Sequence, residues 1–141
     1  MQYPYYSFEV KFSKNTEREK TVWRPIVEII LLHKEKIVSY PVLIDSGADY
    51  NIFDSGVAEA LEIKYTQGKK RQIYGLGAQP IKGYECSLDI RMFGLKTVHT
   101  KAIFTKELSS HAFGVLGNDG FFNHFRVEFN YTKKIIDVKQ K

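Results

Sequence analysis

The chain has 141 residues, 43% of them hydrophobic, and a formal net charge of +5. This length and apolar content are enough for one domain with a single core, without disulfides or a structural metal. The lone Cys86 has no internal bridging partner, no apolar run approaches the ~18 residues that span a bilayer, and residues 1–5 lack a signal-peptide pattern, so we expect a soluble, cytoplasmic protein.

Alternation of apolar and polar residues with a period of two dominates the chain and predicts a mostly antiparallel, all-β fold. The expected strands are residues 6–12, 22–32, 37–44, 71–74, 84–92, 98–104, 126–130 and 134–138. A charged turn at 33–36 joins the second and third of these strands, and residues 15–20 form a charged turn or a flexible excursion. We expect one domain over residues 1–141, in which residues 1–20 are an extension or an extra strand and the core begins at about residue 22.

Two copies of the tripeptide Asp-Ser-Gly occur in the chain, in different contexts. The first, Asp45-Ser46-Gly47, follows the apolar residues 41–44, which places a carboxylate at the end of a buried strand and aims it into a cleft. A turn aspartate with no chemical role is the alternative. The second copy, residues 54–56, precedes an amphipathic stretch at 56–61 and is explained as the N-cap of a short helix.

A glycine-rich stretch at residues 74–80 lies between two expected strands. A dinucleotide loop is excluded, because the third glycine is missing and a strand follows in place of a helix. The stretch is either an ordinary flexible hairpin or, since it follows Asp45, a lid over that residue.

A third motif, Val115-Leu116-Gly117, is followed by Asn118, whose side chain can cap a short helical turn. Alone, two aliphatic residues and a glycine can be mere packing. The order of Asp-Ser-Gly-Ala-Asp, a glycine-rich hairpin and this motif resembles the retropepsin family of single-lobe aspartic proteases. The resemblance runs from about Trp23 to the C-terminus and includes Trp23-Arg24-Pro25 near its start.

The resemblance implies a closed retropepsin-like barrel with a β-hairpin flap, and a homodimer with one catalytic Asp45 from each chain. The chemistry also calls for two carboxyl groups, one to activate water as a general base and one to protonate the carbonyl oxygen. Only Asp45 has a suitable context, so a second chain must supply the other. Two carboxyl groups that share a site cannot both ionise cheaply, so activity is expected to peak at mildly acidic pH.

By the same resemblance, Ser46 bonds across the dimer axis beneath the two carboxylates, and Gly47 lets the substrate backbone approach. The residues implied to bind substrate are Ala48, Asp49, Tyr50, Gly75, Leu76, Gly77, Ala78 and Val115. Retroviral members commonly have an arginine where this chain has Asn118. We expect Arg24 to compensate by pairing with Asp49 of the partner subunit.

The leading interpretation is a homodimeric aspartic endopeptidase, a peptide hydrolase that cuts extended polypeptide. The alternative is a catalytically silent, protease-like dimer that binds peptides. A basic nucleic-acid binder ranks third, because the densest basic run, residues 69–71, is short. The four histidines are scattered without metal-ligand spacing, so we expect no metal and no organic cofactor. The chain ends, residues 6–12 and 135–138, are candidates for the dimer interface by resemblance only.

Overall fold

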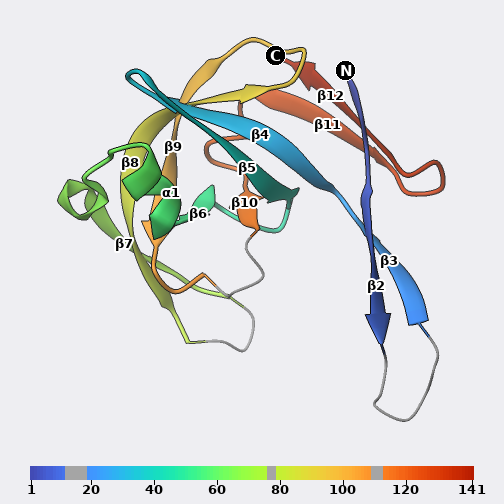
Figure 1. The fold of residues 1–141 in the computed structure, drawn as a ribbon, viewed down its shortest axis with the longest axis horizontal. Helices are drawn as coiled ribbons and strands as arrows, with labels where there is room; N and C mark the ends of the chain where they lie inside the picture. The colour runs from blue at the N-terminus through green and yellow to red at the C-terminus, as the bar shows by residue number, and fades with distance from the viewer. Residues whose placement is uncertain (12–18, 76–78, 109–112) are drawn as a thin grey trace.

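The computed structural model describes residues 1–11, 19–75, 79–108 and 113–141, and most of them lie in strands (Figure 1). The helical elements are α1 (Ser55–Ala60) and the short 3-10 helix η1 (Tyr65–Gln67). The strands are β1 (Gln2–Pro4), β2 (Tyr6–Lys11), β3 (Glu19–Arg24), β4 (Ile26–His33), β5 (Lys36–Ile44), β6 (Ile52–Asp54), β7 (Lys69–Ile73), β8 (Ile81–Met92), β9 (Val98–Thr105), β10 (Gly114–Leu116), β11 (Phe125–Asn130) and β12 (Ile135–Gln140). No helix in these ranges has the length and apolar character to cross a membrane. The prediction of a mostly β chain is confirmed.

The largest sheet closes on itself. Its strand order is β4-β5-β10-β6-β9-β8-β7, and an additional pairing of β4 with β8 closes the first six strands into a ring, with β7 attached to β8 outside it. Most neighbours are antiparallel, but β10 runs parallel to β5, and β6 runs parallel to β9. The turn expected at residues 33–36 is present: His33 and Lys36 are the last pair of the β4–β5 hairpin. The ring of strands surrounds the hydrophobic core on most sides.

Two smaller sheets flank the ring. Strand β12 lies between β1 and β11, and the β11–β12 hairpin forms as predicted. The β2–β3 hairpin is a separate two-stranded sheet that extends away from the ring (Figure 1). The chain ends therefore build structure of their own, outside the closed sheet.

Aromatic residues fill much of the core. Phe53 and Phe104 are fully buried, with ring centroids 6.0 Å apart, and Phe121 stacks on Phe125 at 4.8 Å. Strands β4 and β5 contribute alternate residues to this core, as a period of two requires. Helix α1 covers the core with Val57 and Ala58. The N-cap expected for it is present, since Oδ2 of Asp54 accepts a hydrogen bond from the backbone N–H of Gly56 at 2.9 Å.

Three expectations need correction. The single strand expected at 22–32 is divided between β3 and β4 at Pro25, which has no N–H to donate to a sheet. Of the excursion expected at 15–20, residues 19 and 20 belong to β3, and the remainder lies outside the described residues. No helix follows Asn118: residues 120–124 form turns, and the Asn118 side chain bonds to the backbone of Ser46 instead of capping.

Candidate active site

Asp45 directly follows β5 and lies on the face of that strand that points away from the core. Val42 and Ile44 are 0% and 2% exposed, whereas Leu43 and Asp45 are half-buried. Side chains alternate between the two faces of a strand, so burial of Val42 and Ile44 obliges Asp45 to face outward. The apolar run before Asp45 thus orients the carboxyl group, as expected from the sequence.

The Asp45-Ser46-Gly47 turn holds one oxygen of the carboxyl group in place. The backbone N–H of Gly47 donates to Oδ1 of Asp45 at 2.8 Å, and the N–H of Ala48 donates to the Asp45 carbonyl at 3.1 Å. Ser46 and Gly47 are exposed beside it. A Cβ added to Gly47 would lie 3.2 Å from Asp45 Oδ1, so a larger residue would press on the carboxylate. The turn therefore leaves the Asp45 carboxyl group accessible and restricts its orientation.

The segment that follows Val115 lies alongside the segment that follows Asp45. Asn118 donates its backbone N–H to the Ala48 carbonyl, and Asp119 donates its own to the Asp49 carbonyl, each at 2.8 Å. The side-chain amide of Asn118 also donates to the Ser46 carbonyl at 3.3 Å. The structure therefore brings together the first and third motifs of the sequence, although they are far apart along the chain.

Asn51 is a supporting residue that the sequence analysis missed. Its side chain is fully buried, its Oδ1 accepts from the backbone N–H of Gly117, and its Nδ2 donates to the Lys101 carbonyl, both at 3.0 Å. Buried polar groups are costly unless bonded, so this amide fixes three segments relative to one another. The only signal in the sequence is a polar residue directly before the apolar pair at 52–53, which also suits an ordinary loop.

Gly117 permits the close approach of the two loops. A Cβ at this position would lie 2.7 Å from the carbonyl carbon of Tyr50 and 2.8 Å from the carbonyl oxygen of Ala48. Both atoms belong to the backbone and cannot move aside as a flexible side chain can. The glycine of the apolar-apolar-Gly motif is therefore required by packing against the acid-bearing loop.

A chain of ion pairs links this loop to the base of the β7–β8 hairpin. Glu85 contacts Arg71 Nε at 2.8 Å and Lys101 Nζ at 3.1 Å, and Lys101 Nζ also contacts Asp119 at 3.1 Å. Burial raises the pKa of Glu85, but the hydrogen bonds from Arg71 and Lys101 lower it more, so the net shift is downward. Sequence reasoning missed this network because its four members belong to separate elements.

The glycine-rich stretch connects two paired strands, as expected for a hairpin. Ile73 pairs with Ile81 at the end of the β7–β8 ladder nearest the connection. Gly75 is exposed, and a Cβ there would meet no atom within 4 Å. The predicted substrate-binding residues Leu76, Gly77 and Ala78 lie outside the described residues.

Val115 lines an apolar pocket of about 560 Å³ on the outward side of β5 and β10. Its other lining residues are Tyr6, Phe8, Arg24, Ile26, Leu43, Leu108, Phe113 and Gly114. Leu43 and Val115 are paired in register, so the wall nearest Asp45 consists of the two strands that position it. A hollow suited to an apolar side chain thus lies on the same face of β5 as the acid, two residues before it.

Arg24 and Asp49, which we expect to pair between subunits, are both exposed in the single chain. The Arg24 guanidinium carbon lies 5.6 Å from the centre of the Phe8 ring, a cation–π geometry. Both charged groups are therefore accessible to a second subunit.

Comparison with known proteins gives a fold but no close relative. No protein-family model matches the chain, and no curated protein matches it. A retropepsin-like aspartic protease from Rickettsia conorii superposes with a TM-score of 0.57 at 16% identity, over 81% of this chain and 89% of that one. An EIAV protease complexed with the inhibitor HBY-793 gives a TM-score of 0.47 at 20% identity, over 74% of this chain and 86% of that one. Since the second score is below 0.5, only the first supports the assignment of a retropepsin-like fold.

Proposed function

On this retropepsin-like fold, we propose that the chain is a homodimeric aspartic endopeptidase that hydrolyses extended polypeptide. The observation that carries the proposal is the placement of Asp45: the carboxyl group follows a buried strand, faces outward, and is held by the Gly47 N–H at 2.8 Å. The structural neighbour from Rickettsia conorii is an aspartic protease, which agrees with this assignment. In the proposed dimer the closed sheet acts as a barrel, and the β7–β8 hairpin acts as a flap.

The other acids of these loops have other roles, since Asp49 is expected to pair with Arg24 of the partner subunit and two more are already engaged. Asp54 caps α1, and Asp119 is paired with Lys101 at 3.1 Å. Hydrolysis needs one ionised and one protonated carboxyl group at the same substrate carbonyl. We therefore assign both roles to Asp45, one copy from each subunit, related by a twofold axis.

In the proposed reaction, the ionised Asp45 accepts a proton from water as the water oxygen attacks the scissile carbonyl carbon. The protonated Asp45 of the partner subunit gives its proton to the carbonyl oxygen, which yields a neutral tetrahedral diol. Collapse of the diol re-forms the carbonyl and breaks the C–N bond. The leaving nitrogen takes a proton from the first carboxyl group, the second recovers the diol proton, and the pair returns to its starting state.

The residues around the acid have supporting roles in this proposal. Ser46 bonds across the axis, and Gly47 gives room for the substrate backbone. Ala48, Asp49 and Tyr50 line the cleft, and Val115 faces a side-chain pocket. The glycine-rich stretch from Gly75 to Ala78 closes over a peptide that adds as a strand.

In the proposed dimer, the two chain ends differ in whether their strands have a free backbone edge. Strand β12, which contains residues 135–138, is paired on both edges within its own chain, with β1 and with β11. Residues 135–138 are therefore paired on both sides, and a second subunit cannot add as a strand next to them. In the described part of the chain, residues 6–10 of β2 pair in a sheet with β3 alone, so this part of the strand offers an edge for the role proposed for residues 6–12.

The proposal is tested with denatured protein as substrate and two matched variants. Asp45→Asn removes the general base, whereas Asp54→Asn alters the second Asp-Ser-Gly copy and leaves a good N-cap residue in place. Digestion at mildly acidic pH by wild type and Asp54→Asn, and none by Asp45→Asn at unchanged dimer content, supports a protease. If wild type and Asp45→Asn both bind peptide and neither cuts it at any pH, the chain is a binding module instead.

A further inference from the structure

The outward face of β5 contributes Leu43, two residues before Asp45, to the lining of the 560 Å³ pocket. Pro41, Leu43 and Asp45 alternate along this face and are half-buried, while Val42 and Ile44 point into the core. Leu43 is in register with Val115 of the parallel strand β10. The pocket therefore lies on the face of β5 from which Asp45 projects.

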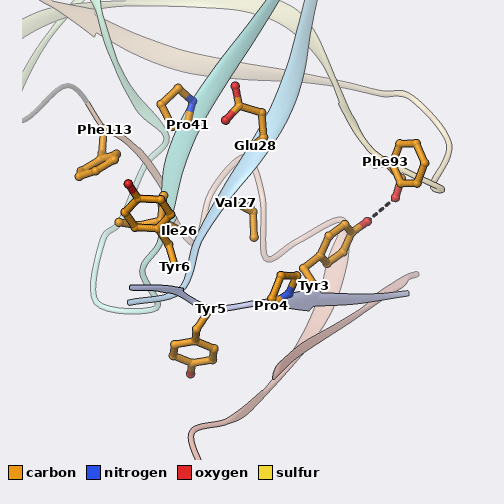
Figure 2. A pocket seen from close by; sticks show the side chains of 10 residues that line it. All are labelled: Tyr3, Pro4, Tyr5, Tyr6, Ile26, Val27, Glu28, Pro41, Phe93 and Phe113. Carbon is orange, nitrogen blue, oxygen red and sulfur yellow. Dashed lines mark hydrogen bonds between the residues drawn. The ribbon is translucent and has the colours of Figure 1, made fainter. Parts of the chain in front are cut away.

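Another wall of this pocket comes from the N-terminal hairpin, whose residues 6–12 we expected only as part of a dimer interface. Tyr6 and Phe8 of β2 line the 560 Å³ pocket together with Leu43 and Val115. The ring centroids of Tyr6 and Phe8 are 6.2 Å apart, and those of Tyr6 and Phe113 are 6.5 Å apart. A neighbouring pocket shares Tyr6, Ile26 and Phe113 with the first. In Figure 2, Tyr6 points toward Ile26 and Phe113, and Tyr5 points away from them.

We propose that Tyr6 and Phe8 are specificity-determining residues, which form the outer wall of a pocket for a large apolar side chain of the peptide cut at Asp45. This inference rests on the proposed protease function. The occupant is apolar because the lining is aliphatic and aromatic, apart from Arg24. The guanidinium of Arg24 is itself stacked on Phe8. An acidic or amide side chain would lose its water there without gaining a full set of hydrogen bonds.

Tyr6 and Phe8 can be changed without disturbing the core. The β2–β3 hairpin is a sheet separate from the ring, and Tyr6 is 51% exposed. Truncation of either side chain removes pocket wall and little core packing. Val10 lies on the same strand, is also exposed, and does not line the pocket, so Val10→Ala is the matched control.

The test measures cleavage preference and not activity alone. Wild-type protein first cuts an equimolar library of unstructured peptides at mildly acidic pH, and the cut sites are identified by mass spectrometry. We expect one position beside the cut to favour Phe, Leu or Tyr. Fluorogenic peptides with Phe or Ala at that position then give the ratio of kcat/KM for wild type, Tyr6→Ala, Phe8→Ala and Val10→Ala.

The inference predicts that Phe8→Ala and Tyr6→Ala each lower the Phe-to-Ala ratio by about tenfold, mainly through the Phe peptide, while Val10→Ala leaves it unchanged. An unchanged ratio in both pocket variants overturns the inference and leaves the protease proposal standing. A library cut equally well by Asp45→Asn, or by neither protein, overturns the protease proposal itself and the inference with it.

Discussion

The backbone N–H of Asp45 donates a hydrogen bond to the carbonyl oxygen of Leu116 at 3.0 Å. This bond extends the parallel pairing of β5 and β10 by one residue beyond Leu116 and Ile44, which are in register. It fixes where the acid-bearing loop leaves the sheet.

Replacing Asn51 by Ala should destabilise the protein by about 2–4 kcal/mol, because two buried backbone groups lose their partners. Those groups are the Gly117 N–H and the Lys101 carbonyl, each 3.0 Å from the side chain. Urea unfolding at a fixed protein concentration measures the loss. The control is Asn130→Ala, whose side chain only accepts from Lys133 in an exposed hairpin, with an expected loss below about 1 kcal/mol. Equal losses in the two variants would contradict the role given to Asn51.

Gly117→Ala and Gly75→Ala should differ sharply in stability. At position 117 a Cβ meets backbone atoms of Tyr50 and Ala48 at 2.7 and 2.8 Å, and at position 75 it meets nothing within 4 Å. We expect a cost of about 3 kcal/mol for the first and almost none for the second. Thermal unfolding of both variants checks this, and a stable Gly117→Ala protein would show that the two loops can separate.

Stability should depend on pH through Glu85. Burial raises the pKa of its carboxyl, but Arg71 and Lys101 lower it further, to below the ordinary value of 4.5. A carboxyl with a depressed folded pKa stabilises the protein above about pH 4.5, and this contribution is lost as the pH falls through the folded value. Glu85→Gln should therefore be less stable than wild type at pH 7.

The gap between wild type and Glu85→Gln should narrow as the pH drops below 4.5. Melting temperatures between pH 7 and pH 3 measure it, with Glu59→Gln, an exposed position on α1, as the control. A constant gap across that range would mean that the ion pairs to Glu85 contribute no stability.

Arg24→Ala should weaken the proposed dimer by about tenfold in Kd, since Asp49 of the partner subunit would lose its counter-charge. Asp49→Ala should do the same, and the double variant should be no worse than either single one. Sedimentation over a range of concentrations gives the constants, with Arg91→Ala of β8 as the control. Additive losses would show that the two residues do not pair.

Much of the fold could be predicted because its long strands bury one face. The apolar run at residues 37–44 predicted β5 and placed Asp45 directly after it, whereas the outward orientation of Asp45 follows from the burial of Val42 and Ile44 in the structure. Short strands carry no such signal: β6 and β10 have three residues each, so their parallel pairings were not foreseen. Strand β1 was missed for the same reason.

Support from distant residues was also invisible in the sequence. The need for Gly117 was part of the motif, but its bond to Asn51 depends on tertiary packing. The ion pairs of the Lys101 ammonium with Glu85 and Asp119 also depend on tertiary packing. Local patterns identified the residues that present the acid, whereas the residues that secure its loop emerge only when the sheet closes.

In the proposed dimer, each active site contains one Asp45 from each of two chains. Wild-type protein is unfolded and refolded with a ninefold excess of the Asp45→Asn variant, so that nearly every wild-type chain pairs with a variant chain, and activity is then measured per wild-type chain. The proposed dimer predicts a fall to about one tenth of the activity of wild type refolded alone. Unchanged activity per wild-type chain would contradict a shared site.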